Sequence, residues 1–142
     1  TRLPIVIPQR ITPDLLHTLT HSRLQSVVVL HCNHPNELDA AVTQAIRDLR
    51  SAGITVLNQS VLLAGINDSA NTLAALSERL FAAGCLPYYL HVLDKVTGSY
   101  HFARSDQDAV HLHRELQALL PGFLVPRLVR ENAGQPSKSW LA

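Results

Sequence analysis

The chain has 142 residues, of which 46% are hydrophobic and 16% are charged, and its formal net charge is +1. This length can bury one hydrophobic core, so we expect a single globular unit. The near-zero charge, without a block of like charges, argues against binding to nucleic acid or to an anionic membrane surface. No apolar run approaches the roughly 20 residues of a membrane span and no signal peptide is recognisable, so the sequence predicts a cytoplasmic protein.

Five short apolar runs, rich in Val, Ile, Leu and Tyr, have the form of strands that are buried on both faces. They are residues 3–7, 26–30, 54–57, 86–92 and 123–129. Four helical patterns lie between them. The first begins at Thr12-Pro13, the second runs from Asn36-Glu37 to Gly53, the third runs from Asp68 or Ser69 to Gly84, and the fourth runs from about Asp106 to Leu120.

This alternation predicts an α/β fold in which parallel strands are joined by right-handed crossovers through helices. Four such units make about half of a TIM-like β/α barrel, which typically needs about 250 residues. A small doubly wound sheet remains an alternative. We expect residues 1–130 to form the barrel portion and residues 131–142 to form a loop and tail. Because the chain begins at Thr1 and contains no Met, we also expect it to be a fragment.

Polar residues follow the predicted strands at the edge where both architectures place their chemistry. They are His31 to Glu37, Asn58-Gln59-Ser60, Asp94-Lys95 and Arg130-Glu131. The tail adds Lys138, whose amine could form an imine with a carbonyl cofactor, although an ordinary solvated lysine is the simpler reading. Asn58, Gln59 and Ser60 could equally satisfy backbone groups of a loop. The carboxylates of Asp94 and Glu131 would suit a substrate ammonium group.

Two further groups of residues could suggest metal or redox chemistry. His31, His34 and Glu37 have a spacing that could hold a metal, but Pro35 favours an extended residue before it and Asn36 has the character of a helix cap. We therefore predict no metal ligands there. Cys32 and Cys85 lie far apart in apolar runs, which is typical of buried thiols.

Several segments, taken in order, resemble the carboxyl-terminal half of lysine 2,3-aminomutase family enzymes. They are Ile7-Pro8-Gln9-Arg10-Ile11-Thr12, His31-Cys32-Asn33-His34-Pro35-Asn36-Glu37, Asn58-Gln59-Ser60-Val61-Leu62-Leu63, Pro87-Tyr88-Tyr89-Leu90, Asp94, His101-Phe102 and Pro136-Ser137-Lys138. The resemblance is closest to the bacterial branch that makes (R)-β-lysine for modification of elongation factor P. It implies a radical S-adenosylmethionine isomerase with a [4Fe–4S] cluster and pyridoxal phosphate on a partial β/α barrel.

The resemblance also implies roles for individual residues. Lys138 matches the family lysine that holds pyridoxal phosphate as an internal aldimine. Asp94 and Glu131 match acidic positions that receive the distal ammonium of the substrate lysine, while His31 and Gln59 match positions that contact S-adenosylmethionine. The implied partners are lysine and the missing amino-terminal half of the barrel, and a homo-oligomer is left open.

The chain departs from the family pattern in several places. It has only two cysteines, so the cluster ligands are not in this chain, which alone should be inactive. Ala64 stands where the family usually has Arg, Glu131 where relatives often have Asp, and Ser139-Trp140 where Thr-Pro is more usual. The phosphate ligands of the cofactor are not identified, and Arg10, Arg23 and Arg130 are only candidates.

Two other classes of function remain open. The chain could be a non-catalytic α/β fragment or ligand-binding module. It could also belong to a metal-dependent barrel enzyme that uses His31, His34 and a carboxylate, or an enzyme that uses a Schiff base at Lys138 without pyridoxal phosphate.

Overall fold

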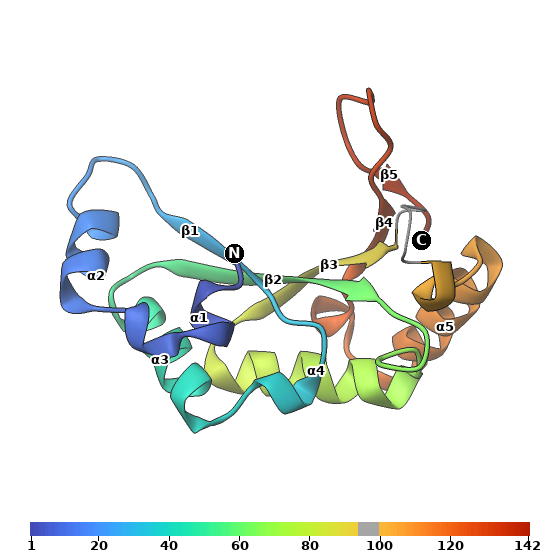
Figure 1. Ribbon diagram of the computed structural model, residues 1–142, viewed down its shortest axis with the longest axis horizontal. Helices are drawn as coiled ribbons and strands as arrows, with labels where there is room; N and C mark the ends of the chain where they lie inside the picture. Colours follow the sequence, from blue (N-terminus) through green and yellow to red (C-terminus); the bar gives the residue numbers. More distant parts are fainter. Residues whose placement is uncertain (94–99) are drawn as a thin grey trace.

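The computed structural model describes residues 1–93 and 100–142 (Figure 1). The helices are α1 (Leu3–Val6), α2 (Pro13–Thr20), α3 (Ala40–Ser51), α4 (Ala70–Ala83) and α5 (Asp106–Leu119). The strands are β1 (Val27–His31), β2 (Thr55–Leu62), β3 (Leu86–Val92), β4 (Arg127–Arg130) and β5 (Ser139–Trp140). Short 3-10 turns cover Pro8–Arg10, Pro35–Glu37, Tyr100–Phe102 and Gly122–Leu124. None of the described helices is long and apolar enough to cross a membrane.

The strands form one sheet in the order β1-β2-β3-β4-β5. The first four strands are parallel, and β5 returns antiparallel to β4. The connections from β1 to β2, from β2 to β3 and from β3 to β4 carry α3, α4 and α5 respectively. The predicted α/β class with parallel strands is therefore confirmed.

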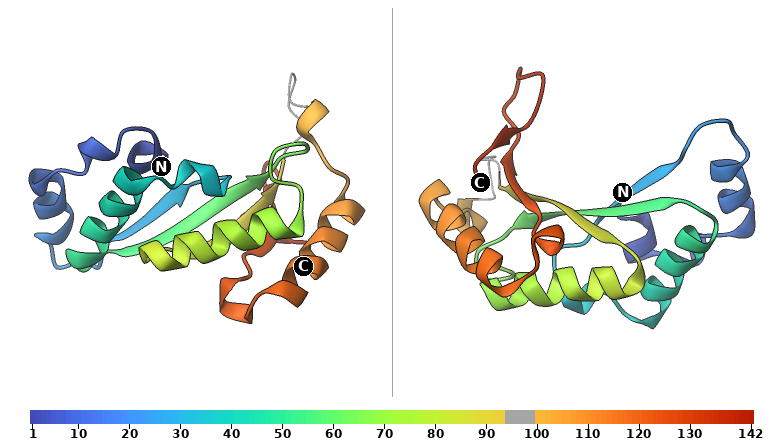
Figure 2. Two further views of the ribbon diagram at one scale, coloured as in Figure 1. Left: turned by 90° about the horizontal axis from the view of Figure 1, so that it is seen from below. Right: turned by 180° about the vertical axis from the view of Figure 1, so that it is seen from behind.

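The helices α3, α4 and α5 all cover the same face of the sheet (Figures 1 and 2). Along β2, buried and half-buried residues alternate, because successive side chains point to opposite faces. Val56 and Leu62 point into the helix layer, whereas Gln59 and Val61 point to the uncovered face. This one-sided covering leaves the other face of the sheet open for a binding site.

Two hydrophobic clusters hold the helices on the sheet. One joins β1, α3 and the end of α4, with Leu30, Ile46 and Leu80 among its members. The other joins β3, α5 and β4, with Leu90, Leu116 and Leu128 among its members. All six side chains are almost fully buried, and each contributes about 1.5–3 kcal/mol relative to an exposed position.

Helix ends follow the local sequence signals. Thr12 and Ser69 cap α2 and α4 through their side-chain oxygens, as predicted. Gly84 ends α4 in the left-handed conformation with a φ of +97°, where a residue with a Cβ would be strained. The second helix differs, because Asp39 caps α3 and residues Asn36 and Glu37 belong to a separate 3-10 turn.

The prediction of a first strand at residues 3–7 is wrong, because Leu3–Val6 forms the short helix α1. Pro4 lies in its first turn, where proline needs no hydrogen-bond partner for its missing N–H. Ile5 packs into the cluster around Leu30. The apolar run indicated burial correctly at Pro4 and Ile5 but not at Val6 and Ile7, which are 58% and 46% exposed. A run of five residues also does not distinguish a helix from a strand.

The strand predicted at residues 26–30 is shifted by one residue, to Val27–His31. Two other predicted strands differ more. The third strand does not end at Leu57 but continues to Leu62, so Asn58, Gln59 and Ser60 lie within it. The last apolar run divides into the 3-10 turn Gly122–Leu124 and the strand β4. The predicted tail also contains a strand, because β5 pairs with β4 and closes a hairpin over residues 131–138.

Strand β1 is the outer strand of the sheet, and Val27 on its uncovered face is 52% exposed. Thr1 covers only part of this edge, donating to Val29 O at 2.7 Å and accepting from His31 N at 2.9 Å. An exposed strand edge with apolar side chains favours pairing with another chain. We therefore expect this 142-residue chain to self-associate at high concentration.

Val27→Lys should reduce that self-association, because a lysine on an edge strand opposes further pairing. Light scattering across a concentration series measures the effect. Leu24→Lys is the matched control, since Leu24 is 65% exposed but lies outside the strand. An unmodified chain that stays monomeric throughout the series would contradict the expectation.

Candidate active site

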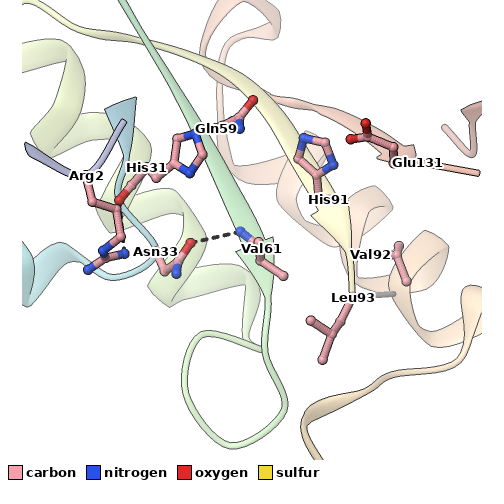
Figure 3. A pocket seen from close by; sticks show the side chains of 9 residues that line it. All are labelled: Arg2, His31, Asn33, Gln59, Val61, His91, Val92, Leu93 and Glu131. Carbon is pink, nitrogen blue, oxygen red and sulfur yellow. Dashed lines mark hydrogen bonds between the residues drawn. The ribbon is translucent and has the colours of Figure 1, made fainter. Parts of the chain in front are cut away.

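A hollow of about 370 Å³ lies on the uncovered face of the sheet, at the carboxyl ends of the parallel strands. Its lining comes from the N-terminal segment, β1, β2, β3 and the end of β4 (Figure 3). The lining residues are Arg2, His31, Asn33, Gln59, Val61, His91, Val92, Leu93 and Glu131. Three of the predicted site residues, His31, Gln59 and Glu131, therefore line one cavity.

His31 and Gln59 lie opposite one another in the pairing of β1 with β2. Gln59 Nε2 lies 2.7 Å from His31 Nε2. An amide nitrogen can only donate, so His31 Nε2 accepts and the ring proton is on Nδ1. Burial, the Thr1 ammonium and Arg2 each lower the pKa of His31, which favours the neutral ring that this contact requires.

The loop after His31 is held by the Glu37 carboxylate. Oε1 of Glu37 accepts from Asn33 N at 2.7 Å and from His34 N at 3.0 Å, while Oε2 pairs with Arg2 at 2.5 Å. His34 Nδ1 accepts from Asn36 N at 3.1 Å, so its ring caps the local turn. Within residues 1–93 and 100–142, no group of three or more His, Cys, Asp and Glu side chains is arranged to hold a metal ion.

Buried amide side chains close the gap between the ends of β1 and β2. Asn58 Oδ1 accepts from Cys32 N at 2.9 Å, and Asn58 Nδ2 donates to Cys32 O at 3.0 Å. Asn67 Nδ2 donates to Asn33 O at 2.7 Å and to Val61 O at 2.9 Å. Leaving one such buried backbone group unpaired costs about 1–3 kcal/mol. Asn58 thus satisfies backbone groups, as one reading of the sequence held, although from within a strand.

Lys138 and Glu131 form an ion pair across the base of the β4–β5 hairpin. Lys138 Nζ lies 2.7 Å from Glu131 Oε2 and 5.7 Å from the ring centroid of Tyr89. The hydrogen bond and charge of Lys138 lower the pKa of Glu131, which keeps this carboxyl ionised. The carboxylate side chain is 65% exposed and the lysine 26%, so the amine is the more enclosed partner. The sequence placed both residues at this edge but did not indicate that they pair.

The candidate phosphate ligands do not lie together. Arg130 makes two hydrogen bonds with Asp106, at 2.9 and 2.5 Å, and so is already neutralised. Arg10 ends the 3-10 turn Pro8–Arg10, and Arg23 lines a separate hollow beside Gly53. Asp94, the other predicted ammonium ligand, lies outside the described residues.

The two cysteines are buried thiols, as predicted. Burial raises the pKa of Cys32 to about 12 and also raises the pKa of Cys85. A metal cluster requires thiolates. These two residues therefore do not fit an iron–sulfur cluster, whereas the enclosed amine of Lys138 does fit attachment of a carbonyl cofactor.

No protein-family model matches the chain. Its sequence is 55% identical over 139 residues to L-lysine 2,3-aminomutase of Escherichia coli, a match that covers 98% of this chain. It is 53% identical over 142 residues to L-lysine 2,3-aminomutase of Haemophilus influenzae, a match that covers 100% of this chain. By sequence, the chain belongs with the carboxyl-terminal part of the lysine 2,3-aminomutases. It spans only 41% and 42% of the length of these two relatives.

A sequence relative of lower identity has the same name, and one solved structure has a similar fold. The chain is 34% identical over 140 residues to L-lysine 2,3-aminomutase of Clostridium subterminale, covering 98% of this chain and 33% of that protein. A radical SAM methyltransferase from Sphaerobacter thermophilus has a similar structure, with a TM-score of 0.63 and 16% identity, covering 84% of this chain and 38% of that one. This likeness concerns the fold alone, and it supports the expected part of a TIM-like barrel.

The contact between His31 and Gln59 depends on pH. The folded protein lowers the pKa of His31 below its ordinary value near 6.5. The ring is therefore neutral at higher pH, and the contact with Gln59 is lost as the pH falls through the lowered pKa. Gln59→Glu should reverse the shift, since a carboxylate beside the ring stabilises its protonated form. An NMR titration of the His31 ring in both proteins measures the two pKa values. A lower pKa in Gln59→Glu than in the unmodified protein would contradict the assigned contact.

Proposed function

We propose that this chain is the carboxyl-terminal part of a lysine 2,3-aminomutase that converts L-α-lysine to (R)-β-lysine. One observation carries the proposal: the Lys138 amine and the Glu131 carboxylate lie 2.7 Å apart, and Glu131 lines the same hollow as His31 and Gln59. A lysine amine, the carboxylate that pairs with it and a polar pair thus lie at one edge of the sheet. The match of nearly this whole chain with the L-lysine 2,3-aminomutases of Haemophilus influenzae and Escherichia coli supports the same reaction.

Each residue has a proposed role. Lys138 Nζ attaches pyridoxal phosphate, and Glu131 holds the distal ammonium of lysine together with Asp94. His31 and Gln59 contact S-adenosylmethionine. The separate [4Fe–4S] cluster would be bound by the amino-terminal portion that this chain does not contain. Pyridoxal phosphate supplies a conjugated system through which an amino group can migrate.

The residues of this chain would act mainly by positioning. A carboxylate at Glu131 fixes the far end of lysine, so that one carbon–hydrogen bond faces the radical source. The Tyr89 ring faces the Lys138 amine at 5.7 Å and limits where the amine can point. The isolated chain should be inactive, because it has only two cysteines and both are buried.

The biological setting is also a proposal. We place the product in the modification of elongation factor P, in the cytoplasm, on the basis of the sequence motifs described above. The chain is 53% and 55% identical to the Haemophilus influenzae and Escherichia coli proteins but only 34% identical to the Clostridium subterminale protein. These identities favour a branch of the family that is separate from the clostridial protein. A homo-oligomer is proposed for the intact protein.

Lys138→Ala in the full-length enzyme should abolish covalent attachment of pyridoxal phosphate with little loss of stability, because a hairpin residue contributes little to the core. The holoenzyme is reduced with borohydride and digested, and mass spectrometry locates the pyridoxyl group. Lys95→Ala is the matched control, since Lys95 is the other lysine of this chain. A label that persists in Lys138→Ala and disappears in Lys95→Ala would contradict the assignment.

Glu131→Gln should weaken productive binding of lysine on the order of tenfold, because a charge-assisted hydrogen bond is lost. An analogue that lacks the distal amine, 2-aminohexanoic acid, should be much less affected. Asp94→Asn is predicted to show the same discrimination. The ratio of kcat/KM for the two substrates measures it, and an equal loss for both would remove Glu131 from the ammonium site.

A further inference from the structure

The ladder between β1 and β2 ends at the His31 and Gln59 pair, although β2 continues to Leu62. Beyond this point, the chain after β1 turns away into the loop of residues 32–37. The backbone groups of Cys32, Asn33 and Val61 therefore need other partners. Two buried side chains, Asn58 and Asn67, supply most of them, and each is only 1% exposed.

The geometry of these contacts requires an amide. Asn58 both accepts from Cys32 N and donates to Cys32 O, so its side chain acts like the backbone of a neighbouring strand. Asn67 donates through Nδ2 to Asn33 O and Val61 O, while its Oδ1 accepts from Leu63 N at 2.8 Å. Asn33 Oδ1 accepts from Val61 N at 2.9 Å and completes the set. A carboxylate in either buried position would lose the donors and face carbonyl oxygens.

These amides lie next to the candidate site in the chain and in space. Cys32 directly follows His31, and Asn58 directly precedes Gln59. The two hydrogen bonds between Asn58 and Cys32 therefore fix the backbone next to each residue of the pair. Asn67 fixes Asn33 and Val61, which line the hollow beside His31 (Figure 3).

We propose that Asn58 and Asn67 are positioning residues for the S-adenosylmethionine site, which they serve by holding His31 opposite Gln59. The proposal rests on the function proposed above for that pair. Neither amide lines the hollow, so neither would touch the ligand. Their effect would be transmitted through the backbone of the loop 32–37 and through the end of β2.

The test uses Asn58→Asp and Asn67→Asp in the full-length holoenzyme. Each should raise the dissociation constant for S-adenosylmethionine on the order of tenfold, the factor that corresponds to the loss of about one hydrogen bond. The KM for lysine and the borohydride labelling of Lys138 should change less than about twofold, because the hydrogen bonds of these amides go to residues 32, 33, 61 and 63, whereas Glu131 and Lys138 follow β4. A general loss of structure would affect all three measurements together.

Asn71→Asp is the matched control, since it makes the same chemical change at an exposed position in the first turn of α4. It should leave all three measurements unchanged. If Asn58→Asp does not fold, Glu37→Gln loosens the same loop from its outer side, because it breaks the ion pair with Arg2. Hydrogen exchange of residues 31–37 should then rise together with the dissociation constant.

A reference variant, His31→Ala, distinguishes a failure of the positioning role from a failure of the proposed function. If His31→Ala weakens S-adenosylmethionine binding but Asn58→Asp, Asn67→Asp and Glu37→Gln do not, the positioning role is overturned and the proposed function stands. If His31→Ala binds S-adenosylmethionine as the unmodified protein does, the proposed role of the pair fails, and the positioning role falls with it.

Discussion

The parallel register of β1 on β2, which sets His31 opposite Gln59, is the constraint on which the candidate site depends. Parallel strands end at one edge of a sheet, and here the helices cover only one of its faces. His31 at the end of β1, Gln59 within β2 and Glu131 directly after β4 therefore open onto one hollow. A shift of one residue in this pairing would turn His31 toward the helix layer, where a polar ring would have to be buried among apolar side chains.

The sequence predicted the elements that carry strong local signals. The range of β3 was predicted without error, and Thr12, Ser69 and Gly84 set helix ends through their own side chains or conformation. The prediction of a strand at residues 3–7 failed because a short apolar run does not distinguish a helix from a strand. The prediction of where β2 ends failed for a different reason. Polar residues in a buried strand normally mark its end, but Asn58 finds its partner in Cys32, which lies 26 residues away in the chain.

The candidate site was predicted in its location but not in its contacts. His31, Gln59 and Glu131 were expected on one rim because parallel strands place their carboxyl ends together, and the hollow contains all three. Asn67 was missed, since nothing in its local sequence indicates the three backbone groups that it binds. Arg130 was a candidate anion ligand from position alone, and its pairing with Asp106 depends on where α5 begins relative to β4.

The ion pair between Lys138 and Glu131 links the proposed attachment of the cofactor to the proposed binding of the substrate ammonium group. Glu131 already holds a cation at 2.7 Å, so its carboxylate is placed and charged as a receptor for an ammonium group. On the proposed function, attachment of a carbonyl cofactor would engage the Lys138 amine and weaken this pairing. The carboxylate would then be available to the distal ammonium of the proposed substrate. Because a solvent-exposed ion pair contributes little to stability, breaking it would cost little of the energy gained when lysine binds.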